Sequence, residues 1–173
     1  MKNTNNHKTK ERLFIHKLDS QFSQKDLIDL VEVCNQPVIY DVLFKEKLNN
    51  KTYEKKHAKE FEEYGNSGWK NNENFVFIIR NTDKKIIGGM DIKSAPPESA
   101  EIGYWADTNH SGFMTNAVKE MVSWAKSKGF ESLYALIVPT NTKSQSLLKR
   151  VEFEYVGKTK ERGKNYLKYE KRL

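Results

Sequence analysis

The sequence predicts a mixed α/β fold, with one domain built on a mostly antiparallel sheet of about seven strands and about four flanking helices. Three observations support this class. The hydrophobic pattern switches several times between the period of a strand and that of a helix. A pair of strand patterns joined by a short polar turn favours antiparallel pairing. The length of 173 residues suits a single domain with a substantial core.

Composition limits the class of protein. Apolar residues make up 37% of the chain and charged residues 31%, with a net charge of +7. No apolar run approaches the roughly 20 residues of a membrane-spanning helix, so no membrane partner is expected. Residues 1–10 are polar and lack the hydrophobic segment of a secretory signal. We therefore expect a disordered tail at residues 1–10, one domain over residues 11–173, and a cytoplasmic location.

The chain offers little for metal or disulfide chemistry. Its single cysteine, Cys34, excludes an internal disulfide and a thiolate cluster. The four histidines are scattered without the spacing of metal ligands. We expect a protein that holds no metal.

In the first part of the chain, a strand is expected at residues 12–18, where apolar side chains alternate. Ser23 and Asp26 have the spacing of a helix N-cap and an acidic first turn, and apolar residues continue this helix to Val33. Pro37 interrupts it. Residues 38–44 fit a short helix or a loop.

A further helix is expected over residues 50–64, where a weak apolar stripe ends at Gly65. Residues 65–74 are then expected to form a polar loop. Within this loop, Trp69 fits a surface anchor or a packed lid about equally.

Two strands are expected at residues 74–80 and 86–93, joined by a turn rich in Asn, Asp and Lys. The pair Gly88 and Gly89 inside the second strand indicates a bulge or a close backbone approach. A turn at residues 94–99 leads into the next strand.

The central stretch passes from strand to loop to helix. Residues 101–106 alternate as a strand, residues 107–112 are polar, and an apolar stripe from Met114 to Ala125 indicates a helix that ends before Gly129. A strand that leads through a Ser/Gly loop to a helix N-terminus offers N–H groups to an anion such as pyrophosphate. The same residues also fit a plain connection with Ser111 as the N-cap.

A second unit of the same kind follows. A buried-type strand at residues 133–138 leads through Asn141 into a short helix that carries Leu147 and Leu148. Two more strands are expected at residues 154–162 and 164–173, turning at residues 162–163.

Two motifs lie in these units. The first reads Glu101-Ile-Gly-Tyr-Trp105 and continues as Gly112-Phe-Met-Thr-Asn-Ala117. The second is carried by Asn141, Ser144, Leu147, Leu148, Arg150 and Phe153. In order and spacing, the two motifs resemble those of the GCN5-related N-acetyltransferase (GNAT) family, specifically its RimJ/RimL branch, which acetylates ribosomal-protein N-termini. The sequence departs from the family pattern where His110 and Glu152 replace glycines.

The resemblance implies a GNAT-like fold in which two central strands splay apart and hold acetyl-CoA as cosubstrate. Carried over residue by residue, it implies that the cofactor is bound by Tyr104, Trp105, Ala106, Asn109, His110, Ser111, Gly112, Phe113, Met114 and Asn141. It also implies that Ser144 protonates or positions the leaving thiolate. The alternatives are a helix N-cap for Asn141 and a plain position on the helix face for Ser144.

Attack by an amine on a thioester requires the neutral amine. Removing its proton at pH 7 costs about 1 kcal/mol for an α-amine and about 4–5 kcal/mol for a lysine, so an α-amine needs only a modest base. Glu101, at the mouth of the central strand, is the best-placed candidate to act through a water. Tyr104 and His110 are weaker candidates, and the alternative for Glu101 is an ordinary strand-edge charge.

The positive charge is concentrated at residues 141–173, which hold ten Lys or Arg against four Asp or Glu. This pattern is typical of a solvated basic surface, and it also suits attraction of polyanionic coenzyme A or contact with the ribosome surface. Direct nucleic-acid binding is not expected.

We therefore predict an acetyl-CoA-dependent N-acetyltransferase whose acceptor is a primary amine, in the first place the α-amine of a ribosomal-protein N-terminus. The alternatives are an acetyltransferase for a small amine or antibiotic, and a coenzyme-A-binding module without turnover. Because dimers are common in the family, we expect a monomer or a homodimer.

Overall fold

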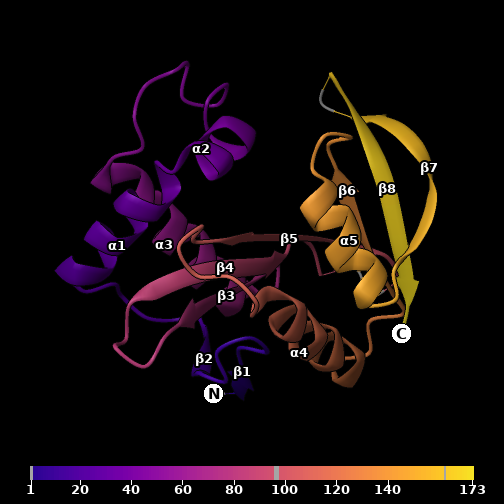
Figure 1. The fold of residues 1–173 in the computed structure, drawn as a ribbon, viewed down its shortest axis with the longest axis horizontal. Helices are drawn as coiled ribbons and strands as arrows, with labels where there is room; N and C mark the ends of the chain where they lie inside the picture. Colours follow the sequence, from indigo (N-terminus) through magenta and orange to yellow (C-terminus); the bar gives the residue numbers. More distant parts are fainter. Residues whose placement is uncertain (1, 96–97, 162) are drawn as a thin grey trace.

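The computed structural model describes the chain except for residues 1, 96, 97 and 162. The described residues form eight strands and five helices (Figure 1). The strands are β1 (Lys2–Asn5), β2 (Arg12–Lys17), β3 (Phe75–Arg80), β4 (Ile86–Ile92), β5 (Ala100–Ala106), β6 (Ser132–Ile137), β7 (Glu154–Glu161) and β8 (Lys164–Arg172), and the helices are α1 (Gln24–Cys34), α2 (Pro37–Leu43), α3 (Lys55–Asn71), α4 (Met114–Ser127) and α5 (Thr142–Arg150). The turns expected at residues 94–99 and 162–163 fall partly on residues 96, 97 and 162, outside the described part.

All eight strands lie in one sheet, in the order β1-β2-β3-β4-β5-β6-β8-β7. Neighbouring strands are antiparallel except β5 and β6, which run parallel. These two strands pair only at Ala100 with Leu133 and at Glu101 with Tyr134, and beyond these pairs they diverge (Figure 1). The mixed α/β class, the mostly antiparallel sheet and the splay of its two central strands are confirmed.

Helices cover both faces of the sheet. Figure 1 shows α1, α2 and α3 grouped on one side of β3–β5 and α4 on the other. The core under α4 includes Met121, and the core under α1 and α3 includes Leu30. Alternate side chains of β5 face these two layers, because Tyr104 packs against the first core and Trp105 against the second.

Helix α3 differs most from expectation, because it begins at Lys55 and continues through Gly65 to Asn71. Gly65 is needed for packing, since a Cβ atom there would lie 2.5 Å from Cδ2 of Leu18. The prediction of a helix end at Gly65 and a loop at residues 65–74 was therefore wrong. The helix ends at Asn72, which adopts the left-handed conformation. Trp69 packs against the core and donates its indole N–H to the carbonyl of Val76 at 2.7 Å.

The N-terminal residues also differ from expectation. Instead of a disordered tail at residues 1–10, Lys2–Asn5 form β1, which pairs antiparallel with β2, with Asn5 opposite Arg12. The turn between the two strands is closed by the side chain of Asn6, whose Oδ1 accepts the backbone N–H of Lys8 at 2.9 Å. A short strand with its own hydrogen-bonded turn extends the sheet by one strand beyond the expected number.

Other local predictions hold. In α1, Ser23 and Asp26 form the expected reciprocal cap, because Ser23 Oγ accepts the Asp26 N–H and Asp26 Oδ2 accepts the Ser23 N–H. Residues 37–43 form a helix, with Pro37 in the first turn, where its missing N–H carries no penalty. No helix in the described part of the chain combines the length and the apolar character needed to cross a membrane.

Candidate active site

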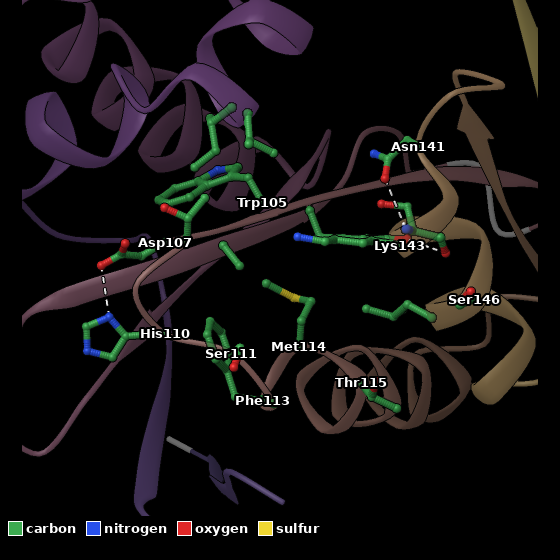
Figure 2. Close-up of a pocket in the computed structure, with 18 of the residues that line it drawn as sticks. Trp105, Asp107, His110, Ser111, Phe113, Met114, Thr115, Asn141, Lys143 and Ser146 are labelled. Atoms are coloured by element: carbon green, nitrogen blue, oxygen red, sulfur yellow. Dashed lines mark hydrogen bonds and ion pairs between the residues drawn. The ribbon is translucent and has the colours of Figure 1, made fainter. Parts of the chain in front are cut away.

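A cleft of about 880 Å³ opens where β5 and β6 diverge. Its walls come from the C-terminal end of β5, the loop and first turn of α4, the start of α5, and α2. Figure 2 shows these side chains converging on the space between β5, α4 and α5. Ten of the predicted site residues line this cleft: Tyr104, Trp105, Ala106, His110, Ser111, Gly112, Phe113, Met114, Asn141 and Ser144. The other two, Glu101 and Asn109, do not line it.

The loop after β5 is held by a buried carboxylate that sequence reasoning missed. Asp107 is 1% exposed, and its side chain accepts hydrogen bonds from Gln36 Nε2 at 2.7 Å and from the Asn109 N–H at 2.9 Å. Asp107 Oδ2 also lies 2.9 Å from His110 Nδ1 (Figure 2). Burial raises the pKa of the Asp107 carboxyl. The hydrogen bonds from Gln36, Asn109 and His110 lower it by more, so the pKa of Asp107 lies below its ordinary value. The Asn109 N–H therefore serves the loop itself.

Helix α4 begins at Met114, after Phe113, and no side chain caps it. The alternative of Ser111 as its N-cap is therefore wrong. Residue Gly112 adopts a φ of +95°, a value that glycine reaches without strain, and this turns the loop into the helix. The first turn of α4 forms part of the cleft wall, because Met114 and Thr115 line the cleft. This arrangement suits an anion.

Helix α5 supplies the opposite wall. Asn141 Oδ1 accepts the N–H of Ser144 at 3.1 Å, so Asn141 is the N-cap of α5. Its amide Nδ2 has no partner among the described residues. The hydroxyl of Tyr104 donates to the carbonyl oxygen of Ser144 at 3.4 Å, and burial raises the pKa of Tyr104 to about 12. Tyr104 is therefore a neutral phenol at physiological pH.

The charge along the cleft is positive. Lys8, Lys143 and Arg150 line it, and among the described residues that line it the sole carboxylate is the buried Asp107. Arg150 is oriented by two contacts of 3.3 Å to Thr115 Oγ1. This distribution suits a polyanionic ligand. Lys8 lies in the segment expected to be a tail, so no sequence signal pointed to it.

Glu101 lies at the point where the pairing of β5 with β6 ends. It is 7% exposed and forms an ion pair with Lys93 of the neighbouring strand segment. Asp91 lies on β4 opposite Gly103 of β5, on the same face of the sheet as Glu101. Burial, opposed by Lys93 and reinforced by Glu101, raises the pKa of Asp91 to about 6. The base of the splay is thus a partly buried cluster of charged groups.

A second cavity of about 290 Å³ lies on the other side of Trp105, which lines both cavities. Its wall is mostly aromatic and aliphatic: Cys34, Phe44, Lys47, Leu48, Tyr53, His57, Glu60, Phe61, Tyr64 and Trp105. A Cβ atom at Gly89 would lie 2.7 Å from Cε2 of Trp105, so the glycine lets the indole lie against β4. The close approach expected at the glycine pair therefore serves Trp105.

Among the described residues, an ion pair joins the two sides of the splay. Lys164 Nζ, at the start of β8, lies 2.8 Å from Glu46 Oε2, in the segment that follows α2.

Within the described residues, no group of three or more His, Cys, Asp or Glu side chains is arranged to hold a metal ion.

Comparisons with known proteins agree with this geometry. The family model for the acetyltransferase (GNAT) domain matches residues 18–154. No curated protein matches the chain. Among solved structures, Mycobacterium smegmatis RimJ in complex with CoA-disulfide gives a TM-score of 0.75 at 15% identity, covering 94% of this chain and 83% of that chain.

Two further structures are similar at the level of the fold. The ribosomal-protein-S5-alanine acetyltransferase from Vibrio fischeri gives a TM-score of 0.71 at 18% identity, covering 93% of this chain and 92% of that chain. The microcin C7 self-immunity acetyltransferase MccE, in complex with acetyl-CoA and AMP, gives 0.74 at 20% identity, covering 92% of both chains.

Proposed function

The chain belongs to the GNAT acetyltransferase family, and we propose that it acetylates the α-amine of a protein N-terminus, with a ribosomal protein as acceptor. Family membership makes it an N-acetyltransferase with acetyl-CoA as cosubstrate, as the sequence predicted. The observation that carries the proposal is the splay between β5 and β6, with a large basic cleft on one side of Trp105 and a small aromatic cavity on the other.

The basic cleft suits acetyl-CoA. Beyond Glu101, β5 has no strand partner on the β6 side in the described residues, so the backbone of Tyr104–Ala106 can pair with the pantetheine amides as an added strand would. Backbone N–H groups between Ser111 and Met114 would receive the pyrophosphate. The unpartnered Nδ2 of Asn141 would donate to the pantetheine arm while its Oδ1 caps α5.

The transfer itself needs one proton removed and one supplied. The neutral amine nitrogen attacks the thioester carbonyl carbon, a C–N bond forms, and the C–S bond breaks to release the thiolate of coenzyme A. We assign Glu101, oriented by Lys93, the role of receiving the amine proton through a water. Ser144, on the cleft wall beside Tyr104, would protonate or position the thiolate.

The aromatic cavity supports an acceptor that carries a side chain close to its amine. At about 290 Å³ it is at the lower end of small-molecule sites, and it is lined largely by aromatic rings. An α-amine is also the acceptor whose deprotonation at pH 7 is least costly, at about 1 kcal/mol. The same cavity size is the observation that favours the second candidate, a small amine or antibiotic as acceptor.

The test is a thiol-release assay with acetyl-CoA and three acceptors. One is a lysine-free peptide with the N-terminal sequence of a ribosomal protein, the second is the same peptide blocked at its N-terminus but carrying a lysine, and the third is a polyamine. We expect kcat/KM for the free α-amine to exceed the other two by at least about tenfold. A preference for the polyamine would favour the second candidate, and cofactor binding without any thiol release would contradict both.

A further inference from the structure

The turn between β1 and β2, residues 6–11, is held by its own hydrogen bonds. Asn6 is 3% exposed, and its Oδ1 accepts the backbone N–H groups of Lys8 at 2.9 Å and Thr9 at 3.3 Å. The Asn6 N–H donates to the carbonyl of Glu11 at 2.9 Å, and the Lys10 N–H donates to the carbonyl of Asn6 at 2.9 Å. The buried Asn6 side chain therefore fixes the shape of the turn.

This turn docks on the loop that leads into α4. Asn6 Nδ2 donates to the carbonyl of Ser111 at 2.9 Å, and the N–H of His7 donates to the carbonyl of Gly112 at 3.0 Å. Farther along, Asn116 Nδ2 donates to the carbonyl of Asn5 at 2.8 Å. The N-terminal turn thus donates hydrogen bonds to two carbonyl groups of the loop. Among the described residues, the turn does not occupy the backbone N–H groups of the loop.

The fit between turn and loop is close. A Cβ atom at Gly112 would lie 2.7 Å from Asn6 Oδ1 and 2.8 Å from Lys8 Cγ, so this residue must be glycine both for its φ and for the approach of the turn. The family model matches residues 18–154, so the turn lies outside the matched residues.

Docking carries a lysine to the mouth of the cleft. His7 and Lys8 both line the 880 Å³ cleft, and Lys8 Nζ lies 3.4 Å from Ser111 Oγ. In the described part of the chain, Lys8 forms no ion pair. Its ammonium group therefore stands beside the proposed pyrophosphate loop without an ion-pair partner in the described residues, in the same cleft that Lys143 and Arg150 line.

We propose that the N-terminal turn is part of the cofactor site, with Lys8 as a phosphate ligand of coenzyme A and Asn6 as the residue that positions the phosphate loop. The inference rests on the proposed cofactor site. A lysine ammonium meets a phosphate oxygen as a charge-assisted hydrogen bond, which is stronger than a neutral one. Asn6 acts through the carbonyls of Ser111 and Gly112, so it touches the loop and not the ligand.

The test uses the full chain and the pair Lys8→Gln and Lys10→Gln. Both lysines lie in the same turn, both are exposed, and both changes remove one positive charge. We expect Lys8→Gln to weaken coenzyme A binding about tenfold at low salt, as loss of a hydrogen bond to a charged group does. Lys10→Gln should change the Kd less than about twofold, because only long-range charge is lost.

Phosphate dependence separates a ligand from a structural residue. S-acetyl-pantetheine carries the thioester but no phosphate, so Lys8→Gln and Asn6→Ala should leave its kcat/KM unchanged while lowering that of acetyl-CoA. A Lys8 effect equal to that of Lys10, or an equal loss with S-acetyl-pantetheine, overturns the inference. If the wild-type protein binds no coenzyme A at all, the proposed function fails instead.

Discussion

The two cavities on either side of Trp105 are built in different ways. The larger cleft, where we propose that the cofactor binds, is shaped by backbone: a strand edge of β5 without a partner in the described residues, a glycine-containing loop and the uncapped start of α4. The second cavity is shaped by side chains, mostly aromatic rings from α3 and from the segment between α2 and α3. Under the proposed function, the first cavity would bind the parts of acetyl-CoA that never change, whereas the second would vary with the acceptor.

This difference decides how mutations should act. Backbone groups survive most substitutions, so changes in the cofactor cleft should alter affinity modestly unless they remove a specific donor. In the aromatic cavity and at the base of the splay, by contrast, side chains would themselves contact the acceptor or its amine. Substitutions there should change turnover more than cofactor affinity.

The largest effect is expected for Glu101→Gln. Loss of the proposed base should lower kcat for a peptide acceptor by about 100-fold or more at pH 7 while leaving the Kd of acetyl-CoA nearly unchanged. The deficit should shrink as the pH rises toward the pKa of the amine, near 8. Steady-state kinetics between about pH 7 and pH 9, about one unit to either side of that value, would measure it. The matched control is Glu98→Gln, which alters an exposed carboxylate; equal rates for the two variants would remove Glu101 from the mechanism.

Trp105→Ala should have the next largest effect. The indole lines both cavities, so its loss merges them and removes an aromatic wall from the acceptor side. We expect kcat/KM for a peptide to fall about 10- to 100-fold, with a Kd for acetyl-CoA within about threefold of wild type. Trp105→Phe should recover most of the activity. A loss confined to cofactor binding would show that Trp105 belongs to the cofactor side alone.

Sequence predicted the residues that line the larger cleft far better than those that line the aromatic cavity, and the reason is physical. A period change, a loop glycine and an asparagine cap are local features, so the strands and helices around Gly112 and Asn141 were predictable. Tyr53 and Phe61 come together only through packing, and in sequence they resemble ordinary core residues. The same holds for Asp107 and its partner Gln36, which are 71 positions apart.

The N-terminal turn was missed because polar composition suggested disorder. Its order depends on partners far along the chain, since Asn6 bonds to Ser111 across 105 positions. Helix α3 was predicted to end too early because Gly65 was interpreted as a helix terminator, whereas it makes room for Leu18.

Glu152 is a position where glycine would be expected but is absent. It adopts a φ of +63°, in the left-handed region that the glycine of its family would favour.

Asp91→Asn tests the charged cluster at the base of the splay through stability. The folded-state pKa of Asp91, about 6, lies above its ordinary value of 3.8, so its protonated form stabilises the fold. That stabilisation is complete below about pH 4 and is lost as the pH rises through about 6. Burial is the main cause of the raised pKa; among charged groups Lys93 lowers it and Glu101 raises it, and backbone hydrogen bonds from Gly103 and Asp91 lower it.

The asparagine side chain cannot ionise, so Asp91→Asn should be more stable than wild type at pH 8 by about 1–3 kcal/mol. The difference should fall toward zero near pH 4. Urea denaturation of both proteins across this range is the measurement. A variant that is less stable than wild type at pH 8 would mean that the ionised carboxylate contributes a net attraction to Lys93.

On the cofactor side, Asn141→Ala should weaken coenzyme A binding about fivefold with little change in kcat at saturation, because one amide donor is lost. The cap of α5 is lost as well, which costs about 1 kcal/mol of stability. Asn141→Asp keeps the capping oxygen but not the amide donor, so it should retain stability and still lose affinity. Full affinity in both variants would leave Asn141 as a helix cap only.

The smallest effect is expected at His110, although it stands where the family has glycine. Its Nδ1 lies 2.9 Å from Asp107, and Figure 2 shows the ring directed to that carboxylate. Asp107 is also held by Gln36, so the loop keeps its shape without the imidazole.

We expect His110→Gly to change the Kd of coenzyme A less than about threefold at both pH 6 and pH 8, a range that spans the ordinary histidine pKa near 6.5. Asp107→Asn should weaken binding more, because it disturbs every bond that fixes the loop. A wild-type affinity that strengthens toward pH 6, and a glycine variant that loses this dependence, would show that the imidazolium reaches a phosphate and that side chains shape the cofactor cleft as well.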